Sequence, residues 1–328
     1  MPRMRALMHH TFGEPADVLT LVEQETDEPG PGEVRVRTAL AAIHNHDLWT
    51  VRGTYGYRPE LPARSGTEAV GVIDAVGPDV QGLRVGQRVS SAGAFGVWAE
   101  SFIARAAALV PVPDEVSDET AAQWISMPFS ALSLVDSLGA EEGDWIVQNA
   151  ANGAVGRLVV PFAAARGIRV LGLVRRSAAV DELTAAGIAD VVATDSADWQ
   201  ERAAEIIGGA TVRAAVDSVG GQAAGDLVSL LSDAGTLVVF GSMGEPNLSL
   251  PTGDIIFRQL TVRGFWGSRV SKDMDTATRT RLMGELVTRI SSGEVSLPVE
   301  EIFPAAEIAD AVRANARAGR AGKVLLRF

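Results

Sequence analysis

The stretch VQNAANGAVGRLV (Val147–Val159) decides the fold, because an apolar strand runs through small residues directly into a helical pattern. Its spacing, Ala151-x-Gly153-x-x-Gly156, is the dinucleotide-binding fingerprint with alanine in place of the first glycine. Because Gly153 has no Cβ, a pyrophosphate can approach the backbone, where the first helical N–H groups face it. Gly156 lets the helix pack closely on the strand. The stretch therefore predicts a dinucleotide site built by Asn152, Gly153, Ala154, Val155 and Gly156. A tight strand–helix turn without a ligand is the alternative.

Strands and helices alternate around this turn, from about Glu115 onward. The predicted strands are Trp145–Asn149, Arg169–Val174, Asp190–Ala193, Ala214–Ser218, Thr236–Phe240 and Thr261–Gly264. The predicted helices between them are Arg157–Arg166, Ala178–Ala186, Trp199–Ile207 and Gln222–Leu231. Unbroken apolar strands that alternate with helices are typical of a parallel sheet covered on both faces. We therefore predict an α/β fold with a Rossmann-type, doubly wound parallel sheet.

The first third of the chain has a different pattern. The segments Gly32–Ile43 and Glu68–Gly77 alternate apolar with polar or small residues, and turns rich in proline and glycine separate them. This pattern predicts a small antiparallel, barrel-like β domain. The predicted domains are residues 1–116 (first part of the β domain), 117–264 (nucleotide-binding domain) and 265–328 (return to the β domain).

The end of the second strand of the predicted sheet indicates which dinucleotide binds. An NAD site usually has an acidic residue there, hydrogen-bonded to the ribose 2′-hydroxyl. In VLGLVRRSAAV (Val170–Val180) that place holds Arg175 and Arg176, and no acid precedes Asp181. Guanidinium groups bind a 2′-phosphate through charge-assisted hydrogen bonds, each contributing roughly 1.5–3 kcal/mol. The sequence therefore predicts NADPH; a solvated arginine pair at a helix start is the alternative.

Composition excludes several classes of protein. The 328 residues include no cysteine, which excludes disulfides, thiol nucleophiles and cysteine-ligated metals. A net charge of −12 provides no general attraction for nucleic acid or an anionic membrane. No segment approaches the roughly 20 apolar residues of a membrane span, and no secretory signal is evident. We expect a cytoplasmic protein whose partner is a small molecule.

Four motifs carry a resemblance to a known family. They are QNAANGAVG (Gln148–Gly156), GTYGYRPELP (Gly53–Pro62), SGTEAVGVI (Ser65–Ile73) and IIFRQLTVRGFWGS (Ile255–Ser268). With a β domain first and a later return to it, nearly the whole chain resembles the medium-chain dehydrogenase/reductase superfamily. It is most similar to the zinc-free quinone oxidoreductases and the trans-2-enoyl thioester reductases. The resemblance implies that the β domain is GroES-like and catalytic.

The resemblance also implies site residues. Tyr55 matches the catalytic tyrosine of the enoyl reductases, and a phenol is a suitable neutral donor to a carbonyl that gains enolate character. Trp266 matches an aromatic residue at the acyl site, with packing at a subunit interface as the alternative. The cofactor residues implied beyond the fingerprint and the arginines are Ser130, Val219, Gly241 and Phe265. Ser130 stands where the family often has threonine, and Met127 replaces an asparagine that it cannot imitate.

No metal is predicted. Zinc-dependent members carry Gly-His-Glu where this chain reads Gly66-Thr67-Glu68, so threonine replaces one ligand. His44 and His46 lie two residues apart and would share one face of a strand, as two metal ligands could. Without cysteine or a third nearby histidine, we interpret them as polar lining of a cleft, with Asp47 as a structural hydrogen-bond acceptor.

These features predict a zinc-independent, NADPH-dependent oxidoreductase that reduces activated C=C bonds of 2-enoyl thioesters or enones. An NADPH:quinone reductase is the close alternative. A sensor or interaction protein that binds NADPH with little turnover is the alternative from another class. The segment LTVRGF (Leu260–Phe265) is expected at the edge of the sheet, where pairing with a second copy would give a homodimer.

Overall fold

The computed structural model describes residues 3–328 and divides the chain into two compact units. Unit 1 comprises the chain up to Ser126 together with Ser296–Phe328, and unit 2 is Met127–Val295. None of the helices among residues 3–328 is long and apolar enough to cross a membrane.

Unit 2 contains a six-stranded sheet in which every neighbouring pair of strands is parallel. Its order is β11-β10-β9-β12-β13-β14. The strands are β9 (Trp145–Gln148), β10 (Arg169–Val174), β11 (Val191–Ala193), β12 (Val212–Asp217), β13 (Thr236–Val239) and β14 (Thr261–Gly264). This confirms the predicted parallel sheet, with strand ends that differ from the predicted ones by two residues or fewer.

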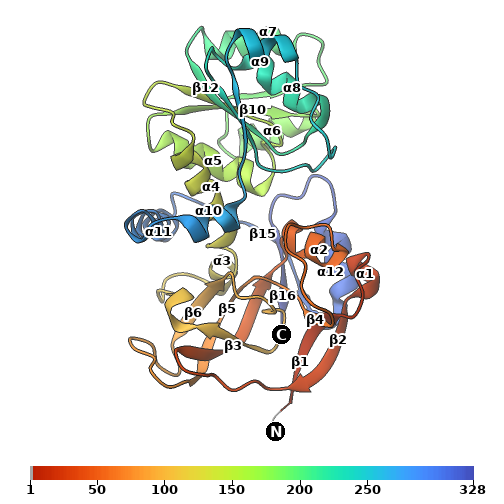
Figure 1. The fold of residues 1–328 in the computed structure, drawn as a ribbon, viewed down its shortest axis with the longest axis vertical. Coiled ribbons are helices and arrows are strands. Elements are labelled where there is room, and N and C mark those ends of the chain that lie inside the picture. Colours follow the sequence, from red (N-terminus) through yellow and green to blue (C-terminus); the bar gives the residue numbers. More distant parts are fainter. Residues whose placement is uncertain (1–2) are drawn as a thin grey trace. The chain divides into compact units, whose positions relative to one another are not determined.

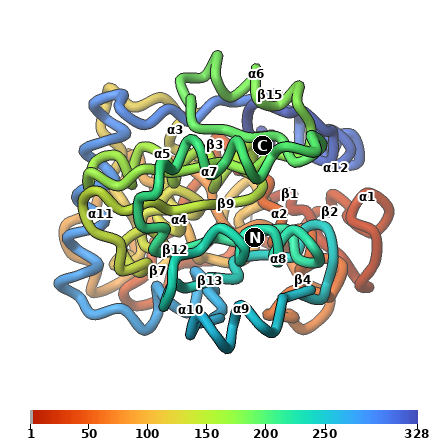
Figure 2. Tube along the Cα trace, turned by 90° about the horizontal axis from the view of Figure 1, so that it is seen from above, coloured from red at the N-terminus to blue at the C-terminus, as the bar shows by residue number. Residues whose placement is uncertain are grey.

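Helices cover both faces of this sheet (Figure 1; from above, Figure 2). The connecting helices are α5 (Ala154–Ala164), α6 (Ala178–Ala185), α7 (Trp199–Ile207), α8 (Gly221–Leu230) and α9 (Thr252–Phe257). Residues of α7 and α8 pack with β9, β10 and β12 in one apolar cluster, whereas α6 packs with β10 and β11 in another. Two separate clusters, one for each set of helices, are what a doubly wound sheet requires.

Unit 1 is built mainly from antiparallel strands. Its large sheet runs β15-β16-β3-β5-β6-β8, with β7 also paired to β3. Within this sheet β15 and β16 pair in parallel, and the other pairs are antiparallel. The strands are β3 (Glu33–Ala42), β5 (Glu68–Val76), β6 (Arg88–Ala92), β7 (Ser101–Arg105), β8 (Leu109–Pro111), β15 (Val299–Pro304) and β16 (Lys323–Arg327). A three-stranded sheet, β2-β1-β4, adds β1 (Arg3–His9), β2 (Thr20–Glu25) and β4 (Ala63–Arg64). The predicted antiparallel β domain is thus confirmed.

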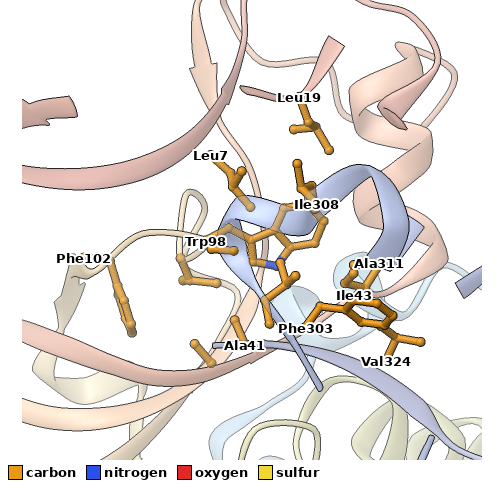
Figure 3. Close-up of a cluster of buried hydrophobic side chains, with 14 of the residues drawn as sticks. Leu7, Leu19, Ala41, Ile43, Trp98, Phe102, Phe303, Ile308, Ala311 and Val324 are labelled. Carbon is orange, nitrogen blue, oxygen red and sulfur yellow. The ribbon is translucent and has the colours of Figure 1, made fainter. Parts of the chain in front are cut away.

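The core of unit 1 gathers side chains from distant parts of the sequence around Trp98 (Figure 3). Leu7 and Ile43 from the first strands meet Phe303 and Val324 from the last ones, and all four are buried. The indole of Trp98 donates a hydrogen bond from Nε1 to the Ala42 carbonyl at 3.0 Å, so burial leaves its polar atom satisfied. The returning segment is therefore an integral part of the first unit's core.

The unit boundaries differ from the predicted domain limits. The chain leaves unit 1 after Ser126 because α3 (Asp118–Ala121) is bound there, with the Ala121 carbonyl accepting a hydrogen bond from Ser90 at 2.7 Å. The linking segment forms two helices, α3 and α4 (Ser126–Ser137), and the Ser117 side chain caps the first by accepting the Thr120 N–H.

The chain also returns to unit 1 later than predicted, at Ser296. The segments α10 (Gly267–Asp273) and α11 (Thr276–Ser291) belong to unit 2 instead. The α11 residue Glu285 pairs with Arg166 at 2.9 Å, and Arg281 pairs with Asp136 on α4 at 2.9 Å. Within the returning segment, α12 (Ile308–Asn315) precedes β16, the last strand of the chain.

Candidate active site

The turn after β9 has the shape that a phosphate cradle needs. Gly153 is the N-cap of α5, and no side chain among residues 3–328 caps it. A Cβ on Gly156 would lie 2.7 Å from the Ala150 carbonyl oxygen and 2.8 Å from the Ala151 Cα, so only glycine fits. The first N–H groups of α5 therefore remain available to an anion. Asn152, Ala154 and Val155 lie in the same turn.

This turn lies where the strand order of the sheet reverses. The chain moves from β9 to one side of the sheet through β10 and β11, and it returns to the other side at β12. In open α/β sheets, ligands bind at such a switch point, outside the carboxyl ends of the strands. The topology and the fingerprint therefore indicate the same edge of the sheet.

Two polar residues that the sequence did not single out cross this switch point. Asn149 follows β9 and donates from Nδ2 to Asp217 Oδ1 at the end of β12, at 2.5 Å. Its Oδ1 accepts the Ser218 N–H at 2.7 Å, and Asp217 accepts the N–H groups of Val219 and Gly220. This network fixes both loops at the site. The available signal was a polar residue directly after each of two apolar strands.

The other predicted cofactor residues of unit 2 lie at the same edge. Arg175 and Arg176 follow β10 directly and are both exposed. Val219 follows β12, Gly241 follows β13, and Phe265 follows β14. Among residues 3–328, neither arginine has an ion pair, whereas the nearby Asp195 is hydrogen-bonded to Ser177 at 2.8 Å. That hydrogen bond lowers the pKa of Asp195, so the acid is ionised but engaged beside the two arginines.

Ser130 and Trp266 are brought into one region of unit 2. Ser130 is buried in α4, and its hydroxyl lies 2.4 Å from where a Cβ of Gly267 would be. Trp266 precedes Gly267 and lines an open pocket of about 700 Å³ at the ends of β13 and β14. The wall of this pocket is mostly apolar, with Phe265, Val270 and Met274 beside the indole. Trp266 is 42% exposed, so its ring is accessible from the pocket.

Tyr55, in unit 1, lies in the loop that follows α2 (Asn45–Arg52). Gly53 ends the helix in the left-handed conformation, with φ of 74°, and the Tyr55 N–H donates to the Trp49 carbonyl at 3.3 Å. Tyr55 is half-buried, and its ring stacks on His46 with centroids 5.8 Å apart. The neighbouring Tyr57 stacks on Phe95 instead, at 4.4 Å.

His44 and His46 lie at the start of a helix, so their predicted placement on a strand is wrong. His44 is the N-cap of α2, and Asp47 Oδ2 accepts its backbone N–H at 2.9 Å. The two rings are still stacked, because His44 is the N-cap and His46 is the second helical residue. Their centroids are 4.9 Å apart, and the angle between the ring planes is 15°. His44 is fully buried and therefore does not line a cleft. The expectation for Asp47, a structural hydrogen-bond acceptor, is confirmed.

His44 lies between two charged side chains and is hydrogen-bonded to both. The ammonium of Lys323 lies 3.2 Å from His44 Nδ1, and His44 Nε2 lies 2.7 Å from Glu68 Oε2. Because a charged ammonium only donates, Nδ1 accepts and Nε2 carries the proton that bonds Glu68. Glu68 Oε1 accepts the N–H groups of Ile125 and Ser126, at the start of α4. The buried carboxylate is thus surrounded by donors.

Burial shifts the pKa values of all three groups. It raises the pKa of Glu68 to about 7, although the N–H groups of Ile125 and Ser126 and the charge of Lys323 oppose the shift. It lowers the pKa of Lys323 to about 8, with Arg320 adding to the effect. It lowers the pKa of His44 well below its usual range, so this imidazole is neutral. The burial of these three side chains therefore requires that the Lys323 cation and the Glu68 anion compensate each other.

A second line of hydrogen bonds fixes His46. The Thr67 hydroxyl donates its only proton to Asp47 Oδ1 at 2.7 Å, so it accepts from His46 Nε2, also at 2.7 Å. Gly66 makes this position possible: its φ is +90°, and a Cβ there would lie 2.1 Å from the Trp98 ring. Within residues 3–328, no cluster of three or more histidine and carboxylate side chains has the arrangement of a metal site.

We expect Lys323→Met to destabilise the protein in a pH-dependent way. At pH 8 the variant should lose about 3–5 kcal/mol of unfolding free energy, because Glu68 becomes a buried charge without a cation. Folded Glu68 binds its proton more tightly than the unfolded chain, whose pKa is near 4.5. The free energy of unfolding of the variant should therefore fall as pH rises from about 5 to 8.

Urea unfolding at pH 5.5 and at pH 8 measures this effect. Lys323→Met combined with Glu68→Gln should recover much of the loss and have a flatter pH dependence. A loss of the same size at both pH values in the single variant would contradict the assigned pairing.

Comparison with known proteins agrees with this geometry. The alcohol dehydrogenase GroES-like domain model matches residues 30–114, and the zinc-binding dehydrogenase model matches residues 154–282. The human mitochondrial enoyl-[acyl-carrier-protein] reductase is 31% identical over 330 residues, which covers 99% of this chain and 88% of that protein. The corresponding enzyme of Arabidopsis thaliana is 32% identical over 272 residues, covering 81% of this chain and 72% of that protein.

A solved structure is similar over the full length. The quinone oxidoreductase of Escherichia coli, crystallised in complex with NADPH, has a TM-score of 0.88 and 26% identity, covering 99% of this chain and 100% of that one. From these matches, the two-unit fold and the fingerprint turn, the chain belongs to the medium-chain dehydrogenase/reductase superfamily, in the branch of the enoyl thioester reductases and quinone oxidoreductases.

Proposed function

We propose that this protein is an NADPH-dependent reductase of C=C bonds conjugated to a carbonyl, with 2-enoyl thioesters as the first candidate substrates. The observation that carries the proposal is the edge of the parallel sheet. The turn that begins α5 there has no room for a Cβ at Gly156, and two exposed arginines follow the adjacent strand β10. The names of the similar proteins, enoyl-[acyl-carrier-protein] reductases and an NADPH-bound quinone oxidoreductase, support the same reading.

The residues at this edge suit the proposed cofactor. The backbone of Asn152–Gly156 would bind the pyrophosphate, and Arg175 with Arg176 would bind the 2′-phosphate. Val219, Gly241, Phe265 and Ser130 would line the remainder of the cofactor. In the part of the chain that the structure describes, no acidic residue directly follows β10, and the nearby Asp195 carboxylate is engaged by the hydroxyl and the backbone N–H of Ser177.

The proposed reaction adds one hydride and one proton to the double bond. NADPH, held by the residues named above, would supply the hydride that the β-carbon of the acceptor takes up. The Tyr55 hydroxyl donates a hydrogen bond to the carbonyl oxygen as that oxygen gains enolate charge, and Tyr55 or water delivers the proton to the α-carbon. Trp266 would contact the acyl group in the apolar pocket of unit 2.

The proposal includes no metal ion. The side chains around Thr67, which stands where zinc-dependent members carry a histidine, are engaged with one another: His44 with Glu68 and Lys323, and His46 with Thr67. The chain has no cysteine to complete a zinc site. A neutral phenol therefore takes the place that a Lewis acid has in metal-dependent alcohol chemistry.

Quinone reduction is the second candidate function, favoured by the similarity to the Escherichia coli quinone oxidoreductase. A quinone accepts charge readily and can be protonated by water, so Tyr55 would matter less in that reaction. A panel of enones, enoyl thioesters and quinones, assayed with NADPH and with NADH, separates the two. Tight NADPH binding without turnover of any acceptor would favour a sensor or interaction protein.

The cytoplasmic location and the small-molecule partner are predictions from the sequence. The absence of cysteine fits a reducing cytoplasm, whereas the curated relatives carry a mitochondrial designation in their names. Small molecules are the proposed partners, because a net charge of −12 offers no general attraction for nucleic acid or an anionic membrane.

Tyr55→Phe should lower kcat and kcat/KM together for an enoyl thioester, by roughly 10²–10⁴-fold. The phenylalanine keeps the ring and removes only the hydroxyl, which acts mainly in the transition state. The dissociation constant for NADPH should be unchanged, because the proposed cofactor residues lie in unit 2. Quinone reduction should fall much less. Wild-type rates with enoyl thioesters and enones would show that Tyr55 is only a packing residue.

Arg175→Ala combined with Arg176→Ala should weaken NADPH binding and leave NADH binding almost unchanged, because only NADPH carries the 2′-phosphate. Loss of two charge-assisted contacts is expected to raise the dissociation constant for NADPH by roughly 10²-fold or more. Arg202→Ala, on the exposed side of α7, is the matched control. An equal loss for both cofactors would assign these arginines another role.

We further propose a homodimer formed through β14. Among residues 3–328, β14 is the terminal strand of its sheet, and Phe257 and Ile256 of α9 beside it are 85% and 60% exposed. Pairing with a second copy would satisfy the edge and cover these side chains.

Light scattering at micromolar concentration should therefore give about twice the chain mass of 34.4 kDa. Phe257→Glu should shift the protein toward the monomer without loss of folding, because that side chain is exposed within one chain. Val85→Glu, at a position in unit 1 that is 58% exposed, is the control. A wild-type monomer would contradict this proposal.

A further inference from the structure

Three aromatic rings form a stack in unit 1. The ring of His46 lies between those of His44 and Tyr55, with centroid distances of 4.9 Å and 5.8 Å. The interplanar angle is 15° between the two imidazoles and 29° between His46 and Tyr55, so each neighbouring pair is stacked. Two of the rings come from the first turn of α2, and the third comes from the loop that follows its last turn.

The two imidazoles are held at their edges and not only by stacking. His46 donates from Nε2 to Thr67, whose own proton goes to the buried Asp47. His44 is bonded at both nitrogens, to Lys323 and to Glu68. Because His44 is neutral, the inner pair of rings has no repulsion between like charges. The stack is therefore a rigid surface against which the Tyr55 ring rests.

The loop that carries Tyr55 needs such a support. Gly53 begins it at φ of 74°, and the N–H groups of Thr54 and Tyr55 donate to the Trp49 carbonyl, which fixes the backbone there but not the direction of the Tyr55 side chain. A proton donor acts efficiently only when its hydroxyl is held near the reacting atom, and a displacement of about 1 Å can lower a rate by roughly 10²-fold. Ring contact with a fixed neighbour supplies that restraint.

We propose that His46 is a positioning residue for the Tyr55 phenol, and that it acts through the face of its ring and not through proton transfer by its nitrogens. This inference rests on the proposed function, in which Tyr55 donates to the acceptor. The two residues meet through their rings, whereas the proton of His46 Nε2 is directed to Thr67.

Two substitutions separate the ring from its nitrogens. His46→Phe keeps a flat ring and removes the hydrogen bond to Thr67, whereas His46→Gln keeps an N–H donor and removes the ring. With crotonyl-CoA as the probe, His46→Phe should stay within about threefold of the wild-type kcat, and His46→Gln should lose roughly 10–100-fold. The KM for NADPH should be unchanged in both. His10→Ala, an exposed histidine of the same unit, is the control.

The opposite order, an active glutamine variant and an inactive phenylalanine variant, would overturn the proposal and assign the effect to the nitrogens. Wild-type activity in both variants, or an equal loss in both, would overturn it as well. In the Tyr55→Phe background, His46→Gln should cause no further loss of kcat, because the hydroxyl that it positions is absent. Losses that multiply would indicate general damage to the unit and contradict the proposal.

Hydrogen exchange of the loop Gly53–Pro62 provides a readout that does not depend on turnover. Exchange should be faster in His46→Gln than in the wild type and unchanged in His46→Phe and in Tyr55→Phe. If His46→Gln does not fold, His46→Leu, which keeps an apolar side chain and removes the flat ring, should raise the exchange instead. Unchanged exchange in the variant that lacks the ring would overturn the stack as a restraint.

Failure of the proposed function has a different signature. If Tyr55→Phe reduces crotonyl-CoA at the wild-type rate, the phenol is not the donor, and the catalytic part of this inference falls with it. Faster exchange in His46→Gln would then still identify the stack as the restraint on the loop.

Discussion

The pairing of Lys323 with Glu68 through His44 is the interaction on which unit 1 depends. Burying a single charge without a partner is costly in free energy, so Lys323 and Glu68 are stable in the core only together. The three residues come from the last strand of the chain, from the start of α2 and from β5. Glu68 also holds the amides at the start of α4, where the chain leaves the unit. This pair of buried charges therefore links the last strand of the chain to β5. Through Glu68 it also holds the segment where the chain passes from unit 1 to unit 2.

The α/β unit could be predicted almost completely from the sequence because its signals are local. Apolar runs bounded by glycine mark each strand, and the fingerprint spacing marks the switch point that the strand order confirms. The fold of this unit is built from consecutive strand–helix pairs, so short windows of sequence contain most of the required information. The placement of Arg175, Val219, Gly241 and Phe265 at one edge follows from strand ends alone.

The β unit resisted prediction in its details because its contacts are distant in sequence. His44 and His46 alternate as they would on a strand, but the Asp47 carboxylate caps the chain into a helix at that point. Lys323 lies 279 residues from His44, so no local pattern announces their contact. The unit limits were misplaced for the same reason, since ion pairs such as that between Arg166 and Glu285 decide where α11 belongs. Asn149 and Asp217, which cross the switch point, were missed because their pairing spans 68 residues.

The hydrogen bonds around Thr67 have an evolutionary consequence. A mutation of this threonine to histidine would give the sequence Gly-His-Glu of zinc-dependent members, but it would not by itself create a metal site. His44 already uses both nitrogens, Asp47 is saturated by Thr67 and a backbone amide, and the ammonium of Lys323 would repel a divalent cation. Several residues would have to change together before any intermediate gained metal affinity. The network thus makes the gain of a metal site at this position a change of several residues and not of one.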